Sequence, residues 1–441
     1  MTCVPKVDIL GKLGEGTAGT VYKVRMDNKE YALKTFREDA LADGNLLELD
    51  ILTRVRHPNV LGSYRTYFAS GECKVCLLLE LADMDMFDYI DAQKPAKKIA
   101  VRAAQVDIMF RLLCAVAYLH TNHIVHRDIK PENILMINGE PKIADFGLSA
   151  IAPMGIRKSA WAGTKVYMAP ELLIRAPTYT PKVDVWSLAI TFYYMITNEE
   201  LIDSEDDDTD ECIQQIIDRI EDYPDYMKES GDDVWKSKIP EPSVWKYEEP
   251  GASKDYFTRI PERWRGMLRR MLRVDPEERA SAAEILDMYF SVRSADPQEG
   301  CNRSTYIENL PFAISPCESY LKVRSGHLQD FYDDNVVGQD DIDYYGFFLG
   351  IDVCDRFFTV DRTVDPRQIE DYILECFRIA FNLYGFSSRS DSAIRCRIVG
   401  SLGFRLYRPT IETYFGNVDK ISLAETLIKN PSPDRIDVAG K

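Results

Sequence analysis

The chain has 441 residues, of which 45% are hydrophobic and 28% are charged, and its formal net charge is −17. This length allows about three domains, and the acidic surplus argues against nucleic acid or an anionic membrane surface as a partner. Residues 1–5 lack the features of a secretory signal, and we find no apolar stretch long enough to span a membrane. The ten cysteines are scattered, so we expect a reduced setting in the cytoplasm, the nucleus or both.

A glycine-rich segment lies near the N-terminus. Residues 14–21 read GEGTAGTV, a G-x-G-x-x-G-x-V pattern with β-branched and other apolar residues on both sides. Glycines let backbone N–H groups approach phosphate oxygens because no Cβ intervenes. The flanks favour a hairpin over a strand-to-helix turn, so we predict a phosphate-binding hairpin formed by Gly14, Glu15, Gly16, Thr17, Gly19 and Val21.

A strand and then a helix are predicted after this hairpin. Ala32 and Lys34 lie two residues apart in the predicted strand 31–34 and therefore share a face. Glu48 begins the segment 48–55, whose apolar residues recur at helical spacing. We expect Ala32 above a nucleotide base, the Lys34 ammonium on the phosphates, and Glu48 as the counter-charge that holds Lys34 in position.

The segment 126–133 reads HRDIKPEN, and DFG follows at 145–147. This spacing of a proton acceptor, a cation and two metal ligands is typical of phosphoryl transfer from a nucleoside triphosphate. We predict that Asp128 accepts or orients the substrate hydroxyl proton and that Lys130 neutralises the transferring group. Asn133 and Asp145 are expected to hold a divalent ion, Mg²⁺.

Two further segments are expected to form the adenine pocket. The apolar run 77–82 predicts a buried strand that leads into a connecting segment. There the backbone from Glu80 to Ala82 is expected to hydrogen-bond the adenine. Leu135, two residues after Asn133, is expected to form the apolar floor of the pocket.

These motifs resemble the eukaryotic protein kinase family over about residues 8–290. Further motifs follow in order: GT at 163–164, APE at 169–171, DVWS at 184–187, and Arg279, which the resemblance pairs with Glu171. The KPEN form at 130–133 is similar to serine/threonine kinases. The resemblance implies an α+β bilobal fold, with a small β-sheet lobe carrying one helix (8–82) and a larger, mainly helical lobe (83–290). It also implies ATP and Mg²⁺ as cofactors and proteins as substrates.

The glycine-rich segment resembles that of the cyclin-dependent kinases, which a cyclin activates by pushing the glutamate-bearing helix inward. Two residues depart from that pattern. Met168 stands where those kinases have an arginine tied to a preference for proline, so proline-directed specificity is left open. Ala18 replaces a tyrosine used for inhibitory phosphorylation, so Thr17 is the residue left for that role.

Control by phosphorylation is also expected in the segment 148–168. Arg127 lies beside Asp128 and has no obvious partner in the sequence until this segment carries negative charge. Thr164 is better placed to hydrogen-bond Asp128 and Lys130. Ser159 matches the activating phosphothreonine of the cyclin-dependent kinases, so our hypothesis is that phosphorylated Ser159 pairs with Arg127; an ordinary exposed loop serine is the alternative.

The C-terminal third is predicted to be a separate, small all-α domain. The segment 291–304 is polar, contains proline and glycine, and is expected to be a linker. Apolar residues at helical spacing then predict helices over 345–358, 366–384 and 391–407. We place the domain at 305–418 and a tail at 419–441.

Two strings make this domain resemble a cyclin box: 348–358, similar to its Asp-Arg-Phe helix, and 398–410, similar to its fifth helix and the following turn. An unrelated helical bundle is the alternative. Cyclins grip their kinase through a lysine and a glutamate, and the matching positions here are Asn382 and Arg395. Covalent tethering could replace that grip, because a linked domain acts at high effective concentration.

Three hypotheses follow from the sequence. The favoured one is a serine/threonine kinase, acting as a monomer rather than a dimer, with its own cyclin-like activator; binding of a separate cyclin stays open. The second is an active kinase whose C-terminal domain only docks substrates. The third, a kinase-shaped scaffold without turnover, is disfavoured because all four residues that such scaffolds lose are present: Lys34, Asp128, Asn133 and Asp145.

Overall fold

The computed structural model divides the chain into two compact units. Unit 1 comprises residues 1–56, 62–81 and 303–441, and unit 2 comprises 57–61 and 82–302. The residues that the structure describes are 7–16, 19–36, 46–69, 74–93, 101–152, 156–157, 163–176, 178–204, 208–220, 256–290, 323, 326–329, 331, 341–383 and 392–402.

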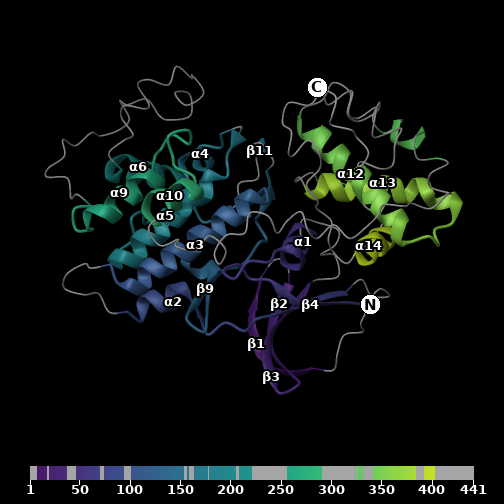
Figure 1. Ribbon diagram of the computed structural model, residues 1–441, viewed down its shortest axis with the longest axis horizontal. Coiled ribbons are helices and arrows are strands. Elements are labelled where there is room, and N and C mark those ends of the chain that lie inside the picture. Colours follow the sequence, from purple (N-terminus) through teal and green to yellow (C-terminus); the bar gives the residue numbers. More distant parts are fainter. Residues whose placement is uncertain are drawn as a thin grey trace. The chain divides into compact units, whose positions relative to one another are not determined.

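Five antiparallel strands form the sheet of unit 1, in the order β1-β2-β3-β5-β4 (Figure 1). Asp27 and Asn28 form the two-residue turn between β2 and β3, and their φ angles of 50° and 60° are left-handed. Aspartate and asparagine tolerate this conformation, which suits a tight hairpin. The strand bounds are β1 Asp8–Glu15, β2 Gly19–Met26, β3 Lys29–Phe36, β4 Ser63–Ala69 and β5 Lys74–Leu79.

Helix α1 (Leu46–Arg54) is buried at all eight positions from Leu46 to Thr53. A helix that packs on a sheet ordinarily leaves its outer face in water, so burial all round means that α1 is covered on both sides. It contacts β4 and also α13 (Ile369–Leu383), a C-terminal helix of the same unit. The predicted helix 48–55 therefore exists, and it begins two residues earlier than Glu48.

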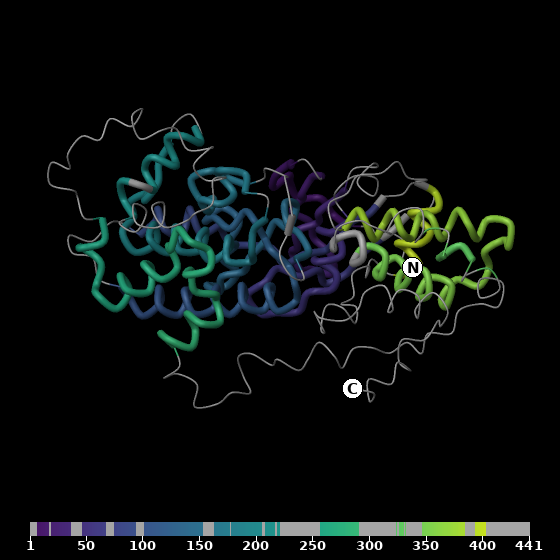
Figure 2. Tube along the Cα trace, turned by 90° about the horizontal axis from the view of Figure 1, so that it is seen from above, coloured from purple at the N-terminus to yellow at the C-terminus, as the bar shows by residue number. Residues whose placement is uncertain are grey.

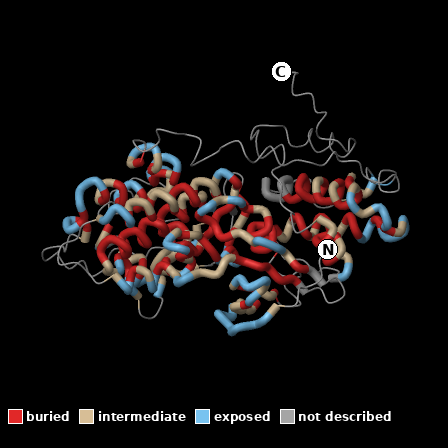
Figure 3. The backbone as a smooth tube through the Cα atoms, turned by 60° about the horizontal axis from the view of Figure 1, so that its bottom comes forward, coloured by how far each residue is buried: buried red, intermediate tan, exposed pale blue. Residues whose placement is uncertain are grey.

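Unit 2 is mainly helical. Its central helix, α5 (Lys182–Thr197), is buried at every position after Lys182. In Figure 3, buried residues (red) gather in the interior and exposed residues (pale blue) lie around the outside. The other α-helices described here are α2 Met86–Asp91, α3 Ala103–Thr121, α4 Pro170–Leu173, α6 Thr209–Arg219, α9 Glu262–Met271 and α10 Ala282–Phe290. Short strands connect them: β6 Met84–Asp85, β7 Ile124–Val125, β8 Ile134–Ile137, β9 Glu140–Ile143, β10 Ala150–Ile151, β11 Ile156–Arg157 and β12 Thr178–Tyr179. Together with the sheet of unit 1, this helical lobe gives the predicted α+β fold.

One expectation about apolar segments needs correction. By length and composition alone, the 19-residue helix α3 would be able to cross a membrane. Half of its most apolar stretch is buried inside the protein, and α3 contacts α5 and α10. The apolar composition of α3 is explained by its burial in the helical lobe. A short apolar pattern in the sequence does not by itself distinguish a buried helix from a membrane-spanning one.

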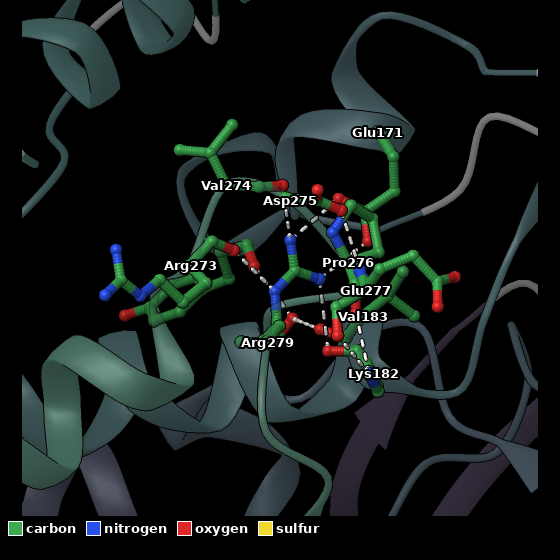
Figure 4. A network of polar contacts seen from close by, with 11 residues as sticks. Glu171, Lys182, Val183, Arg273, Val274, Asp275, Pro276, Glu277 and Arg279 are labelled. Atoms are coloured by element: carbon green, nitrogen blue, oxygen red, sulfur yellow. Dashed lines mark hydrogen bonds and ion pairs between the residues drawn. The ribbon is translucent and has the colours of Figure 1, made fainter. Parts of the chain in front are cut away.

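Arg279 and Glu171 form a bidentate ion pair that joins two distant parts of unit 2 (Figure 4). The Arg279 Nη1 and Nη2 atoms lie 2.6 and 3.0 Å from the two Glu171 carboxylate oxygens, and both side chains are buried. Arg279 Nε also donates to the carbonyl of Arg273 at 2.8 Å. Such complete hydrogen bonding is what makes a buried charge pair tolerable. The predicted pairing of these two residues is confirmed.

Among the described C-terminal residues of unit 1, the helices α12 (Asp341–Val360), α13 and α14 (Ser392–Ser401) contact one another (Figure 2). Two glycines of α12 let α13 approach closely. A Cβ at Gly350 would lie 2.3 Å from Cδ1 of Phe377, and one at Gly346 would lie 2.6 Å from Cε1 of Phe381. Only glycine fits at either position without displacing an aromatic ring.

The predicted C-terminal helices are present with shifted bounds. Residues 366–368, expected inside the second helix, form a 3-10 turn, and the Asp365 side chain caps it by accepting from the Arg367 N–H. The linker 291–304, the tail 419–441 and most of the string 398–410 lie outside the described residues. Cys396 is in a disulfide bond, whereas Cys376 of α13 is not.

Arg395 has an internal role that the sequence did not predict. Its Nε lies 2.6 Å from the Glu375 carboxylate of α13, and both side chains are fully buried. Arg378 adds a second contact to Glu375 at 3.3 Å. Arg395 thus ties α14 to α13 within the helical domain, and this buried residue stands where cyclins have the glutamate that grips their kinase.

Candidate active site

The glycine-rich segment closes the β1–β2 hairpin of unit 1, as predicted. Gly14 pairs with Val21 and Glu15 with Thr20, and the Gly16 N–H donates to the Gly19 carbonyl at 2.9 Å. No atom would lie within 4 Å of a Cβ added at Gly14 or Gly16, so both face open space that a phosphate could occupy. Thr17, with its predicted phosphate and regulatory roles, lies outside the described residues.

Gly19 is required for a different reason. A Cβ at this position would lie 2.0 Å from the carbonyl oxygen of Thr35 on β3. The glycine therefore allows β2 to approach β3 at the start of the strand pair, where Gly19 lies opposite Phe36. The sequence pattern alone does not separate this packing role from phosphate binding.

Lys34 of β3 and Glu48 of α1 form the predicted ion pair. Their side chains are 14% and 1% exposed, so the Glu48 charge is placed almost entirely out of water. The Lys34 ammonium also lies over the Phe36 ring, 5.2 Å from its centroid, a contact that sequence analysis missed. Ala32, on the same face as Lys34, is buried.

In unit 2, the carboxylate of Asp128 is held by residues on both sides. Oδ1 accepts hydrogen bonds from the Thr164 N–H at 2.9 Å and the Thr164 hydroxyl at 3.1 Å. Oδ2 accepts from the Asn133 amide at 2.8 Å and lies 3.3 Å from Lys130 Nζ. Lys130 in turn donates to Thr164 Oγ1 at 2.7 Å. This network brings together three predicted site residues and Thr164, as expected from the sequence.

A buried aspartate holds the backbone of residues 126–127, directly before Asp128. Asp184, in the first turn of α5, accepts from the backbone N–H groups of His126 and Arg127, each at 2.8 Å, and from His120 Nε2 at 2.9 Å. Burial by itself raises the pKa of Asp184, but the hydrogen bond and charge of His120 bring that pKa below its ordinary value. Sequence analysis named Asp184 only as a motif residue; a carboxylate in the first turn of an apolar helix was the available signal.

The two predicted metal ligands present oxygen atoms from neighbouring positions. Asn133 donates its amide N–H₂ to Asp128, to the carboxylate and to the backbone carbonyl at 2.8 Å each, which leaves its amide oxygen for a cation. Asp145 is exposed and has a left-handed φ of 61°. In the described ranges no three His, Cys, Asp or Glu side chains form a metal-binding group. A magnesium ion that keeps waters and phosphate ligands needs only one or two protein carboxylates, so these residues fit it.

The predicted adenine-binding residues have well-defined neighbours. Leu135 lies in β8 and is half-buried, paired with Lys142 of β9 and Asp85 of β6. Glu80 follows β5 and accepts from the Tyr64 hydroxyl at 3.1 Å. Glu80 belongs to unit 1, whereas Ala82 and Leu135 belong to unit 2. The adenine contacts of these residues remain predictions.

Arg127 interacts with neutral acceptors. Its guanidinium donates to the carbonyls of Leu148 at 2.5 Å and Ser149 at 3.3 Å, and to the Tyr179 hydroxyl at 3.2 Å. Among the residues described by the structure, no carboxylate is paired with it. The predicted partner Ser159 lies outside the described residues, so its phosphorylation stays a prediction.

Comparisons with known proteins agree with this site. A family model for the protein kinase domain matches residues 7–291. Cyclin-dependent kinase 8 of Caenorhabditis elegans is 30% identical over 332 residues, which cover 65% of this chain and 56% of the worm protein. Cyclin-dependent kinase 8 of Drosophila melanogaster is 28% identical over 324 residues, covering 66% and 71%.

A human kinase is similar over a shorter stretch. The NUAK family SNF1-like kinase 2 of Homo sapiens is 32% identical over 209 residues, covering 46% of this chain and 32% of that protein. The chain spans little more than half the length of cyclin-dependent kinase 8 of Caenorhabditis elegans and of Caenorhabditis briggsae, 56% and 53%. The family model, by contrast, covers well over half of this chain, and the chain belongs to the protein kinase family.

Proposed function

We propose that the protein transfers the γ-phosphoryl group of ATP to serine and threonine hydroxyls of protein substrates. One observation carries this proposal: the Asp128 carboxylate is fixed by Thr164 and Asn133, with Lys130 3.3 Å away. A carboxylate held in this way is oriented to accept a hydroxyl proton, and the adjacent ammonium can neutralise charge on the transferring group.

The remaining residues supply positioning. ATP would bring the phosphoryl group, and Mg²⁺ would neutralise its phosphates when bound. Lys34, fixed by Glu48, is available to contact phosphate oxygens, and Gly14 and Gly16 leave room for phosphates near the backbone. Asn133 and Asp145 offer oxygen atoms to the metal ion. The network around Asp128 holds Asp128, Lys130 and Asn133 ready before substrate arrives, which reduces the reorganisation needed during transfer.

This activity is tested with the full chain, γ-labelled ATP, Mg²⁺ and two degenerate peptide pools. One pool carries serine and threonine acceptors, and the other carries tyrosine only. We expect label in the first pool and none in the second, and we expect EDTA to abolish it. Absence of transfer to either pool, with ATP binding intact, would mean that the chain is a scaffold.

We also propose that the C-terminal helical domain is a cyclin-like activator that acts on its own kinase domain. The support is the position of α13, which contacts α1, the helix that carries Glu48. Because α1 is buried from Leu46 to Thr53, helix α13 occupies a face that would otherwise be exposed. Holding α1 in place keeps Glu48 within reach of Lys34.

The burial of α1 also bears on whether a separate cyclin binds to this helix. A separate cyclin that used α1 would need an exposed face on it, and the residues from Leu46 to Thr53 offer none. We therefore propose a monomer that needs no second chain for this step. The second candidate, in which the helical domain docks substrates, would leave phosphoryl transfer to simple peptides independent of the helical domain.

Gly350→Ala separates these two proposals without touching the kinase domain. The new Cβ would collide with Phe377 and push α12 from α13, at a cost of about 1–3 kcal/mol to the packing of the helical domain. If α13 supports α1, phosphoryl transfer to the peptide pool falls. Gly326→Ala is the matched control, because no atom lies within 4 Å of a Cβ at that position.

The readout combines peptide phosphorylation with hydrogen exchange of the α12 and α13 amides. In-cis activation predicts that Gly350→Ala speeds exchange in these helices and lowers the rate of phosphorylation. Faster exchange with an unchanged rate would instead support a docking domain.

A further inference from the structure

The side chain of Arg127 is oriented by neutral groups, one of which belongs to a residue far along the chain. Two of its three acceptors, the carbonyls of Leu148 and Ser149, are backbone atoms that no substitution removes. The third is the hydroxyl of Tyr179, which accepts from Arg127 Nη1 at 3.2 Å. Resting on the function proposed above, we propose that Tyr179 is a positioning residue for phosphoryl transfer, which acts by holding Arg127 and through it the Asp128 loop.

Tyr179 is itself firmly placed. It lies in β12, which pairs with β11 of the segment that follows the Asp145 motif: Tyr179 is opposite Ile156, and Thr178 is opposite Arg157. Its side chain is 5% exposed. Burial raises the pKa of Tyr179, although the charge of Arg127 acts against this, so the hydroxyl stays neutral and can accept from the guanidinium at ordinary pH.

The backbone around Arg127 explains why this contact matters for Asp128. Arg127 has a left-handed φ of 68°, an unfavourable conformation for a residue with a side chain. Its N–H is held by Asp184 at 2.8 Å, and its side chain by Tyr179 and the two carbonyls. Contacts to its backbone N–H and to its side chain keep this strained residue in place. Because Asp128 is the next residue in the chain, these contacts also fix the backbone position of Asp128.

Tyr179 also connects this loop to the segment in which control is expected. β12 pairs with β11, so Tyr179 joins the Arg127–Asp128 loop to that segment.

Tyr179→Phe in the full chain tests this inference, with Tyr193→Phe as the matched control. The Tyr193 hydroxyl also makes one hydrogen bond from a buried site, to the carbonyl of Tyr256 at 3.2 Å, but it has no contact with Arg127. Both substitutions remove one buried hydroxyl and keep the ring. A hydrogen bond to a charged group is worth more than one between neutral groups, so we expect Tyr179→Phe to lower kcat about tenfold.

Melting temperature, KM for ATP and a double-mutant cycle with Arg127→Ala separate positioning from a general loss of stability. The inference predicts that Tyr179→Phe lowers kcat with KM for ATP unchanged, that the two phenylalanine variants melt alike, and that Tyr179→Phe has no further effect once Arg127 is alanine. If Arg127→Ala is too slow to measure, hydrogen exchange at residues 147–151 replaces the cycle and is expected to rise in Tyr179→Phe alone.

Three outcomes would overturn the inference. They are equal kcat for Tyr179→Phe and Tyr193→Phe, an additive loss in the Arg127→Ala background, or exchange at 147–151 that does not change. None of these affects the proposed function, which depends on transfer by the unsubstituted chain. If that chain fails to transfer phosphate, the proposed function fails first and the exchange measurement still tests the Tyr179–Arg127 contact.

Discussion

Replacing Asp128 with asparagine is expected to lower the rate of phosphoryl transfer by about 10²- to 10⁴-fold. The asparagine has the size of the original side chain and its oxygen can still accept from Thr164, but its N–H₂ group replaces the oxygen that accepts from the Asn133 amide. It cannot take up a proton at neutral pH, and it removes the negative charge that lies 3.3 Å from Lys130. ATP binding, which depends on Lys34 and the glycine-rich hairpin, should be retained.

The measurement is the initial rate of peptide phosphorylation at saturating ATP, with nucleotide affinity determined separately. Asp107→Asn is a suitable control, because this carboxylate of α3 is 45% exposed and pairs with the nearby Arg111 of the same helix. A rate for Asp128→Asn within twofold of the unsubstituted chain would remove Asp128 from the catalytic role assigned to it.

Removing residues 303–441 is expected to lower phosphoryl transfer on the order of 100-fold. The deletion uncovers the face of α1 that contacts α13 and lets water reach the Lys34–Glu48 pair. Disruption of a buried ion pair typically costs about 3–5 kcal/mol. If α1 leaves its position, Lys34 loses the charge that fixes its ammonium, and phosphates are no longer oriented for transfer.

Loss of folding could produce the same result, so the truncated chain needs its own control. Circular dichroism and the affinity for ATP report whether residues 1–302 still fold. A truncated chain that folds, binds ATP and transfers phosphate at the full rate would mean that the helical domain acts in docking.

The catalytic loop could be predicted because its chemistry is local. Asp128, Lys130 and Asn133 lie within six residues, and a loop of that length brings their side chains together whatever surrounds it. The Lys34–Glu48 pair was also predictable, since a strand lysine and a helix glutamate of opposite charge fit one motif. In both cases the residue types and the spacing carried enough information.

The supports of the site are long-range and could not be predicted with the same certainty. Asp184 lies 58 residues from His126, whose N–H it accepts, and Tyr179 lies 52 residues from Arg127. Residues this far apart in the sequence come into contact only when α5 and the segment before it pack against the catalytic loop. No periodicity in the sequence reports such contacts, because they depend on tertiary structure.

The helical domain shows a second limit. Its helices follow from apolar spacing, yet the sequence identified Arg395 only as the residue at the position of a cyclin glutamate and did not predict its ion pair with Glu375. Its burial against Glu375 depends on how α13 and α14 pack. The role of Gly346 and Gly350 also depends on packing. Glycine has a low helix propensity, but at these two positions it allows Phe381 and Phe377 of α13 to approach α12 closely.

The most direct test of in-cis activation adds the fragment 303–441 to the truncated chain 1–302 and measures peptide phosphorylation against fragment concentration. We predict a saturable rise toward the rate of the full chain, which the Gly350→Ala fragment fails to produce and the Gly326→Ala fragment reproduces. A truncated chain that binds ATP but is unaffected by the fragment at any concentration, while the full chain is active, would contradict the proposal that α13 activates the kinase by supporting α1.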